Sequence, residues 1–482
     1  MLILATVAAY FIALFLFSRL SSKGAGNDAF YRGNRQSPWY MVAFGMVGAS
    51  ISGVTFISVP GMVIHSDMTY LQTCLGFILG YFAVAFVLLP IYYRLNLTTI
   101  YTYLSHRLGK HAYKTGATFF LISKMSGAAA RFYVVCLILQ RFVVDSIGNI
   151  PFTITVVAMV ALIWLYTRRG GIKTLVWTDT FQTICMLTAL ICIIYNVVSE
   201  LNLTPAEAVE TIKANPYSRI FVFDDWLSKQ NFWKQFLSGI FIVMVMTGLD
   251  QDMMQKNLTC KNLREAQKDM CTYGLAFVPV NLLFLSLGVL LAILAQQRGL
   301  TLPAASDELL PMFAASGALG NLIVILFTIG IVAASFSSAD SALTAMTTCY
   351  CIDIREQPAN EQLRRQAHVA LAVVFTLVIL LFKTIHSTSV IEAIYIMCSY
   401  TYGPLLGLFS FAILTNRTAT GKAVPLVAIA APIACHIVDI ATQNFLGYKF
   451  GYELLMLNGA LTFIGLWSIS KPRPTQPNAI KE

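Results

Sequence analysis

The amino-acid sequence predicts an all-α polytopic membrane protein with about thirteen transmembrane helices. Of its 482 residues, 57% are hydrophobic and only 12% are charged, about half the charged share of a typical soluble domain. The mean hydropathy is +0.70. Apolar runs of about 20 residues, long enough to cross a bilayer, recur from one end of the chain to the other. So few charges cannot cover a water-exposed surface of this size, which excludes a soluble enzyme and a disordered protein.

The apolar runs set the expected elements in order. The first run, 1–20, lacks a basic start and a small-residue cleavage site, so we expect a retained helix and not a signal peptide. The remaining helices are expected at 38–64, 70–95, 113–143, 151–168, 173–198, 232–251, 266–297, 319–352, 365–384, 388–415, 422–443 and 451–470. These elements form a single transmembrane domain, with 1–20 leading, 38–198 and 232–415 as two repeats, 422–470 as a trailing pair and 471–482 as a cytoplasmic tail. Two inverted five-helix repeats are a common plan among transporters.

The net charge of +10 is a topology signal and does not indicate a nucleic-acid partner. Most Lys and Arg residues fall in alternate loops, such as 168–173 and 256–268, which are cytoplasmic if the N-terminus is outside. The C-terminus is then cytoplasmic, and we expect a plasma (inner) membrane protein. The ten cysteines are scattered without a CxxC pair, as expected of packing residues. No feature indicates an obligate protein partner.

The second predicted helix contains VGASISGVTFISVPG (47–61). Gly48 and Gly53 permit unwinding, while Ser50, Ser52 and Thr55 offer hydroxyl groups in an apolar setting. Broken helices expose backbone carbonyls at the sites of transporters. The alternative is that these small residues serve close helix packing.

The ninth predicted helix contains AASFSSADSALTAM (333–346), with Ser337, Ser338 and Ser341 around Asp340. A carboxylate at membrane depth is costly unless it is paired or solvated, so Asp340 is a functional candidate. Hydroxyl, carbonyl and carboxylate oxygens are the ligands that a hard cation prefers. The alternative is that the serines bond to their own helix.

Four further polar residues lie in or beside apolar runs. Asp179 is either a functional carboxylate or a helix-end charge near the cytoplasm. Arg131 either pairs with an acidic side chain or binds an anionic ligand. Asp250 and Asp252 are expected to be structural or gating residues at the cytoplasmic face.

Motifs of enzymes and ATP-driven pumps are missing from the sequence. The histidines are dispersed, and no catalytic triad, P-loop, HExxH or dinucleotide fingerprint is present. We therefore expect no enzyme, and an ion gradient as the energy source. A membrane-embedded sensor and a channel are the more remote alternatives.

The broken-helix stretch, the WTD segment (177–179), the DQDMMQ segment (250–255) and the serine-rich helix ending in CIDI (351–354) together resemble the sodium:solute symporter family. The resemblance covers about residues 27–470. It implies a LeuT-type fold of two inverted five-helix repeats plus extra helices, and symport of a small organic solute with sodium as the coupling ion.

The resemblance also implies sodium ligands. A first site would use the backbone carbonyls of Gly48, Ile51 and Ala334 with the hydroxyls of Ser337 and Ser338. A second would use Asp179, Ser341 and the Ser337 backbone. Asp340 stands where another hydroxyl is usual, so the resemblance leaves open whether one sodium, two sodium ions, or a sodium and a proton bind.

Within the family the pattern is most similar to the sodium/sialic acid symporters. Ser50, Ser52 and Thr55 match substrate hydroxyls, Arg131 matches the arginine for the substrate carboxylate, and Tyr70 replaces another aromatic residue. Cys74 stands where a glutamine is expected, with Gln72 two positions earlier. These matches imply import, by alternating access, of an acidic sugar such as sialic acid or of another carboxylate. A neutral sugar or other uncharged solute is the alternative.

Overall fold

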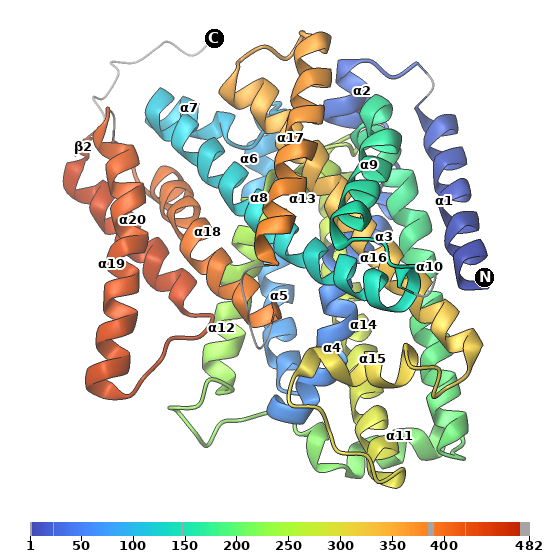
Figure 1. Ribbon diagram of the computed structural model, residues 1–482. Helices are drawn as coiled ribbons and strands as arrows, with labels where there is room; N and C mark the ends of the chain where they lie inside the picture. The colour runs from blue at the N-terminus through green and yellow to red at the C-terminus, as the bar shows by residue number, and fades with distance from the viewer. Residues whose placement is uncertain (1, 23, 146–147, 384–389, 420, 473–482) are drawn as a thin grey trace.

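The computed structural model describes residues 2–22, 24–145, 148–383, 390–419 and 421–472 as a helical bundle (Figure 1). Part of the predicted tail 471–482, from residue 473 on, and positions 388–389 of the helix predicted at 388–415 lie outside the described residues.

The long helices are α1 (Leu2–Ser21), α5 (Tyr70–Ala83), α8 (Lys110–Leu139), α9 (Phe152–Gly170), α10 (Ile172–Glu200), α14 (Leu263–Gln297), α16 (Asn321–Cys349), α17 (Glu361–Phe382), α18 (Val390–Leu414), α19 (Ala423–Leu446) and α20 (Leu454–Ile469). Two spans are each split in two: α3 (Trp39–Ser50) with α4 (Gly53–Ser66), and α12 (Phe232–Val243) with α13 (Gln251–Asn257). The short helices are α2 (Asn27–Arg32), α6 (Leu89–Arg94), α7 (Thr102–Leu108), α11 (Pro205–Ala214) and α15 (Leu309–Ala314). The strands β1 (Arg417–Thr418) and β2 (Lys471–Pro472) pair antiparallel.

The predicted class, an all-α polytopic membrane protein, is confirmed. Within the described residues, 9 helices are long and apolar enough to cross a membrane, or up to 11 if each bent pair is one span. Two shorter apolar helices, Ala5–Ser21 and Leu454–Ile469, fall below this length. The total of thirteen spans therefore stays a prediction.

The break predicted in the second helix is confirmed between α3 and α4, whose axes are bent by 62°. Ser52 begins α4, because its hydroxyl accepts a hydrogen bond from the backbone N–H of Thr55 at 3.3 Å and so caps the new helix. Gly48 and Gly53 lie where helices approach closely. A Cβ on Gly48 would collide with the Thr183 hydroxyl, and a Cβ on Gly53 would collide with the Ser335 hydroxyl.

A second break was not predicted from the sequence. The sequence predicted one helix over 232–251, whereas the structure has α12 followed, after a bend of 70°, by α13. A π-helical turn over Met244–Gly248 loosens the end of α12. Asp250 then starts α13 by accepting the N–H of Asp252 at 2.8 Å. Glycine followed by a capping aspartate is the sequence pattern that could have indicated this restart.

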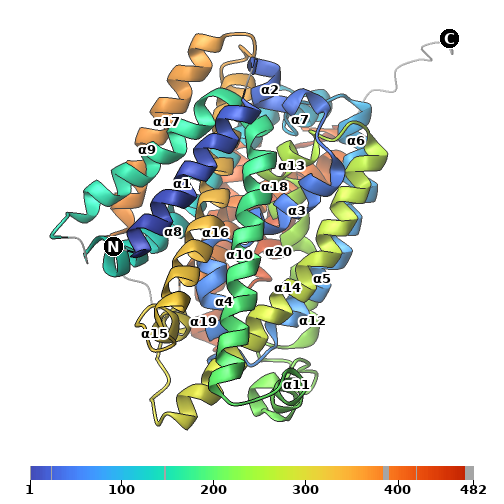
Figure 2. The ribbon, with the colours of Figure 1, turned by 90° about the vertical axis from the view of Figure 1, so that its right-hand side faces the viewer.

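The two broken spans lie inside the bundle, one in each predicted repeat. Helix α10 packs against α16 and α3, and α14 packs against α4 and α5. Helix α8 packs against α16 and α18. Figure 1 shows α1 at one flank of the bundle and the pair α19 and α20 at the opposite flank, and Figure 2 shows α10 and α16 side by side. The division into repeats 38–198 and 232–415 stays a prediction.

Replacing Gly288 with alanine is expected to destabilise the bundle. Gly288 on α14 faces α4, where a Cβ would collide with the carbonyl oxygen of Pro60 and lie 2.7 Å from its carbon. Backbone cannot retreat as a side chain can, so Gly288→Ala should cost about 1–3 kcal/mol. The melting temperature in detergent measures this loss. Gly127→Ala on α8 is the control, because a Cβ at that position would have nothing within 4 Å. Equal melting temperatures would contradict this account of the α4–α14 contact.

Candidate functional site

A cavity that is partly open to solvent lies where the broken spans meet α5, α8, α14, α16 and α18. Its walls combine the aromatic side chains of Phe77, Phe132 and Phe277 with hydroxyl and charged groups. Mixed linings of this kind are typical of sites for small polar solutes.

Five of the six predicted substrate residues line this cavity: Ser50, Ser52, Thr55, Tyr70 and Arg131. Cys74 does not line it, although it lies one turn further along α5 and is fully buried. Gln72 does not replace it, because its carboxamide donates to the Gln230 carbonyl at 2.9 Å and accepts from the Val222 N–H at 3.2 Å. Among the described residues, the cavity lining therefore contains no amide side chain.

The hydroxyl groups of the cavity are linked into pairs. Ser50 shares a hydrogen bond with the Tyr273 hydroxyl, which also accepts from Tyr81 at 2.7 Å. The hydroxyls of Ser52 and Thr55 lie 3.2 Å apart. These links hold the hydroxyls facing the cavity, where each retains further capacity for a solute.

Two basic side chains of α8 reach the cavity, and they differ in their partners. Lys124 is matched by two carboxylates, at 3.1 Å from Asp250 and 2.7 Å from Asp252. Tyr402 also donates to Asp250, at 2.5 Å. Sequence reasoning missed Lys124; its signal was a lysine in the middle of an apolar run. Arg131, two turns further along, makes no ion pair or side-chain hydrogen bond to any described residue.

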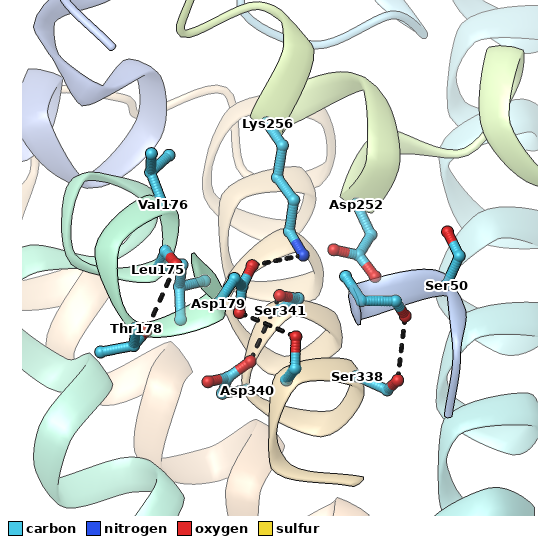
Figure 3. Close-up of polar contacts among 12 residues, drawn as sticks. Ser50, Leu175, Val176, Thr178, Asp179, Asp252, Lys256, Ser338, Asp340 and Ser341 are labelled. Atoms are coloured by element: carbon cyan, nitrogen blue, oxygen red, sulfur yellow. Dashed lines mark hydrogen bonds and ion pairs between the residues drawn. The ribbon is translucent and has the colours of Figure 1, made fainter. Parts of the chain in front are cut away.

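A second polar site lies beside the cavity, between the end of α3 and the serine-rich face of α16 (Figure 3). The Ser338 hydroxyl donates to the carbonyl of Ala49 at 3.0 Å and to that of Ala334 at 3.2 Å. It therefore connects the broken helix with α16. The carbonyl oxygens of Gly48 and Ile51 accept no hydrogen bond from described residues. Free carbonyls beside hydroxyls form a ligand set suited to a hard cation.

Asp179 and its neighbours on α16 form a cluster behind this site. One oxygen of Asp179 accepts from the Ser337 hydroxyl at 2.9 Å. Asp340 accepts from Tyr166 at 2.6 Å and from Ser341 at 3.2 Å. The predicted residues are thus brought together from α10 and α16.

Lys256 of α13 enters the same cluster, with its ammonium nitrogen 2.7 Å from Asp179 and its side chain only 2% exposed (Figure 3). Sequence reasoning missed this contact, because it placed Lys256 among the basic residues of a cytoplasmic loop. Across the described ranges, no three His, Cys, Asp or Glu side chains are grouped to hold a metal ion.

Replacing Lys124 with methionine is expected to destabilise the protein. The change leaves Asp250 and Asp252 buried without their cation, and breaking a buried pair in this way costs about 3–5 kcal/mol. The melting temperature should fall clearly. Lys213→Met is the control, because Lys213 is 67% exposed and pairs only with exposed Glu210, so its removal should change little. An unchanged melting temperature for Lys124→Met would show that the carboxylates do not need this cation.

Known proteins resemble the chain over nearly its full length. The sodium/sialic acid symporter NanT of Aliivibrio fischeri is 26% identical, covering 90% of this chain and 87% of the relative. The sodium/sialic acid symporter SiaT of Proteus mirabilis is 24% identical, covering 90% and 89%.

Solved structures share the fold. A Na⁺-coupled sialic acid symporter in a substrate-bound outward-open state superposes with a TM-score of 0.82 at 20% identity, covering 98% of this chain and 99% of the other. Mhp1, a nucleobase-cation-symport-1 family transporter, superposes with a TM-score of 0.59 at 15% identity, covering 91% and 92%. The expected LeuT-type fold is confirmed. The model of the sodium:solute symporter family matches residues 30–425, so the chain belongs to this family of transporters, with sodium as the coupling ion.

Proposed function

We propose that this protein imports an acidic sugar such as sialic acid, or another small carboxylate, together with sodium by alternating access. The observation that carries the proposal is Arg131, which lines the cavity without an acidic partner among the described residues, whereas Lys124 has two. An unpaired guanidinium at membrane depth is costly. A substrate carboxylate matches its planar fork through two parallel hydrogen bonds.

The rest of the cavity supports a sugar-like solute. Ser50, Ser52 and Thr55 present hydroxyls from the broken span, which suit the hydroxyl groups of a sugar. Aromatic walls cover the apolar faces of such a ring. The two relatives that span 90% of the chain are named sodium/sialic acid symporters.

We further propose that one sodium ion binds between the α3–α4 break and α16. Its ligands are the carbonyls of Gly48, Ile51 and Ala334 and the hydroxyls of Ser337 and Ser338. The ion draws the broken helix and α16 into the arrangement that binds substrate. By linkage, substrate then tightens sodium binding by the same factor.

The orientation proposed from the loops puts the N-terminus outside and the C-terminus in the cytoplasm of a plasma (inner) membrane. Five arginines at the ends of three helices support it, because these ends were assigned to one side and line a common surface hollow: Arg19, Arg168, Arg169, Arg364 and Arg365. Such clustering fits the positive-inside rule. The protein is proposed to need lipid but no obligate protein partner.

Uptake of labelled sialic acid into proteoliposomes, with and without an inward sodium gradient, tests the proposed function. Sodium-driven accumulation is the expected result. A folded protein that sodium stabilises thermally, but that takes up no sialic acid, would exclude this substrate. Other carboxylates and then neutral sugars would be tested next.

Arg131→Gln is expected to raise KM for the carboxylated sugar about 10–100-fold, because a charge-assisted hydrogen bond contributes about 1.5–3 kcal/mol. Sodium-dependent thermal stabilisation should persist, since Arg131 is not a proposed sodium ligand. Arg298→Gln, which removes a part-exposed ion pair with Glu200, is the control and should transport normally. Unchanged transport by Arg131→Gln would contradict the carboxylate assignment and favour a neutral solute.

Ser338→Ala is expected to raise the sodium concentration for half-maximal uptake about tenfold, the effect of losing about 1.4 kcal/mol of binding free energy. Ser126→Ala serves as the control, because the Ser126 hydroxyl bonds within its own helix to the Ile122 carbonyl at 2.8 Å. Identical sodium activation of Ser338→Ala and the wild type would remove Ser338 from the proposed ligands.

A further inference from the structure

We propose that the ammonium group of Lys256 takes the place of a bound cation beside Asp179, so that each protein molecule binds a single sodium ion. The inference rests on the proposed sodium site between the α3–α4 break and α16. It concerns the cluster behind that site, where Asp179, Asp340 and Ser341 offer a second set of oxygens.

The position of Lys256 follows from the second break. After the 70° bend, α13 packs against α10 and α16. The lysine nitrogen lies 2.7 Å from Asp179, and the two side chains are 2% and 1% exposed. The second oxygen of Asp179 is occupied by the Ser337 hydroxyl. One oxygen of Asp179 thus faces the ammonium group in an ion pair, and the other accepts a hydrogen bond from a hydroxyl group.

The residues on either side of Lys256 hold it in this position. The Gln255 carboxamide donates to the Tyr31 carbonyl at 2.9 Å and to the Thr348 hydroxyl at 3.0 Å. The Asn257 carboxamide donates to the Ala266 carbonyl at 3.0 Å and to Asp269 at 2.5 Å. Because α13 is anchored on both sides of the lysine, the ammonium group is delivered to Asp179 by the fold.

The charge of Lys256 opposes a second sodium ion here. An ion held by Asp179 and the nearby oxygens of α16 would lie against a buried ammonium group of the same sign. Like charges at such distances repel strongly where water is excluded. The carboxylate of Asp340 is instead met by the hydroxyls of Tyr166 and Ser341.

The Ser337 hydroxyl connects the cluster with the proposed sodium site. Its hydrogen is directed at Asp179, which leaves oxygen lone pairs for an ion on its other side. The Lys256–Asp179 pair therefore fixes the orientation of a sodium ligand while contributing no transported ion. A tethered cation stays with the protein through the cycle, whereas sodium is released.

The test counts ²²Na⁺ ions bound per molecule of purified full-length protein at saturation, without substrate. The wild type is expected to bind one ion. Lys256→Met should bind two, because sodium then fills the vacated position beside Asp179. Lys256→Met/Asp179→Asn should return to one. Lys261→Met is the matched control, since Lys261 is exposed in the loop that follows α13, and it should bind one.

Two ions on the wild type, or still one on folded Lys256→Met, would overturn the assignment of Lys256. If Lys256→Met does not fold, the Asp179→Asn variant provides the test instead. Asp179→Asn should bind one sodium ion, the same number as the wild type. A fall from two ions in the wild type to one in Asp179→Asn would show that Asp179 is a sodium ligand. No ion on the wild type would instead contradict the sodium site of the proposed function.

Discussion

The need to satisfy every polar group within an apolar bundle governs this structure. A membrane interior offers no water to unpaired carbonyls or charges. The two broken spans nevertheless place helix ends and carboxylates inside the bundle. Polar groups at each break have a partner on a neighbouring helix. At the first break, the Ser338 hydroxyl donates to the Ala49 carbonyl, and at the second, Lys124 forms ion pairs with the two aspartates. Where the described structure leaves groups unmatched, at the carbonyls of the first break and at Arg131, it offers places for an ion and an anionic solute.

Close packing makes these matches possible. Helix α16 presents alanine and serine toward its neighbours, and Gly48 and Gly53 remove side chains where the first broken span meets α10 and α16. Small residues bring backbone carbonyls within reach of hydroxyl groups on another helix. Packing and ligand chemistry are therefore two uses of the same residues, and the alternatives weighed for the 47–61 motif are compatible.

The sequence predicted features that one segment carries by itself. Length and hydropathy placed the long helices within a few residues, and glycine with serine indicated the first break. The sequence also identified Asp179, Asp340 and the serines of α16 as candidate site residues, and the fold brings them together. Contacts between segments far apart in the chain could not be predicted from the sequence. Lys256 stands among basic residues at a helix end, where a solvated loop is the usual setting, and only the bend before α13 turns it inward. Gln72 was likewise a candidate to replace the expected glutamine in the cavity. In the structure its carboxamide instead forms hydrogen bonds with the backbone of the loop at 222–230.

The buried ammonium of Lys256 has an energetic consequence for the carrier. One sodium ion moving with one monovalent carboxylate carries no net charge across the bilayer, so the membrane voltage does no work on the cycle. The solute can then be concentrated no further than the sodium ratio allows. A tenfold sodium gradient, equivalent to about 1.4 kcal/mol, supports at most a tenfold accumulation. A protein in which a side chain replaces one sodium ion therefore reaches a lower maximum accumulation of solute. Its uptake, however, continues when the membrane is depolarised.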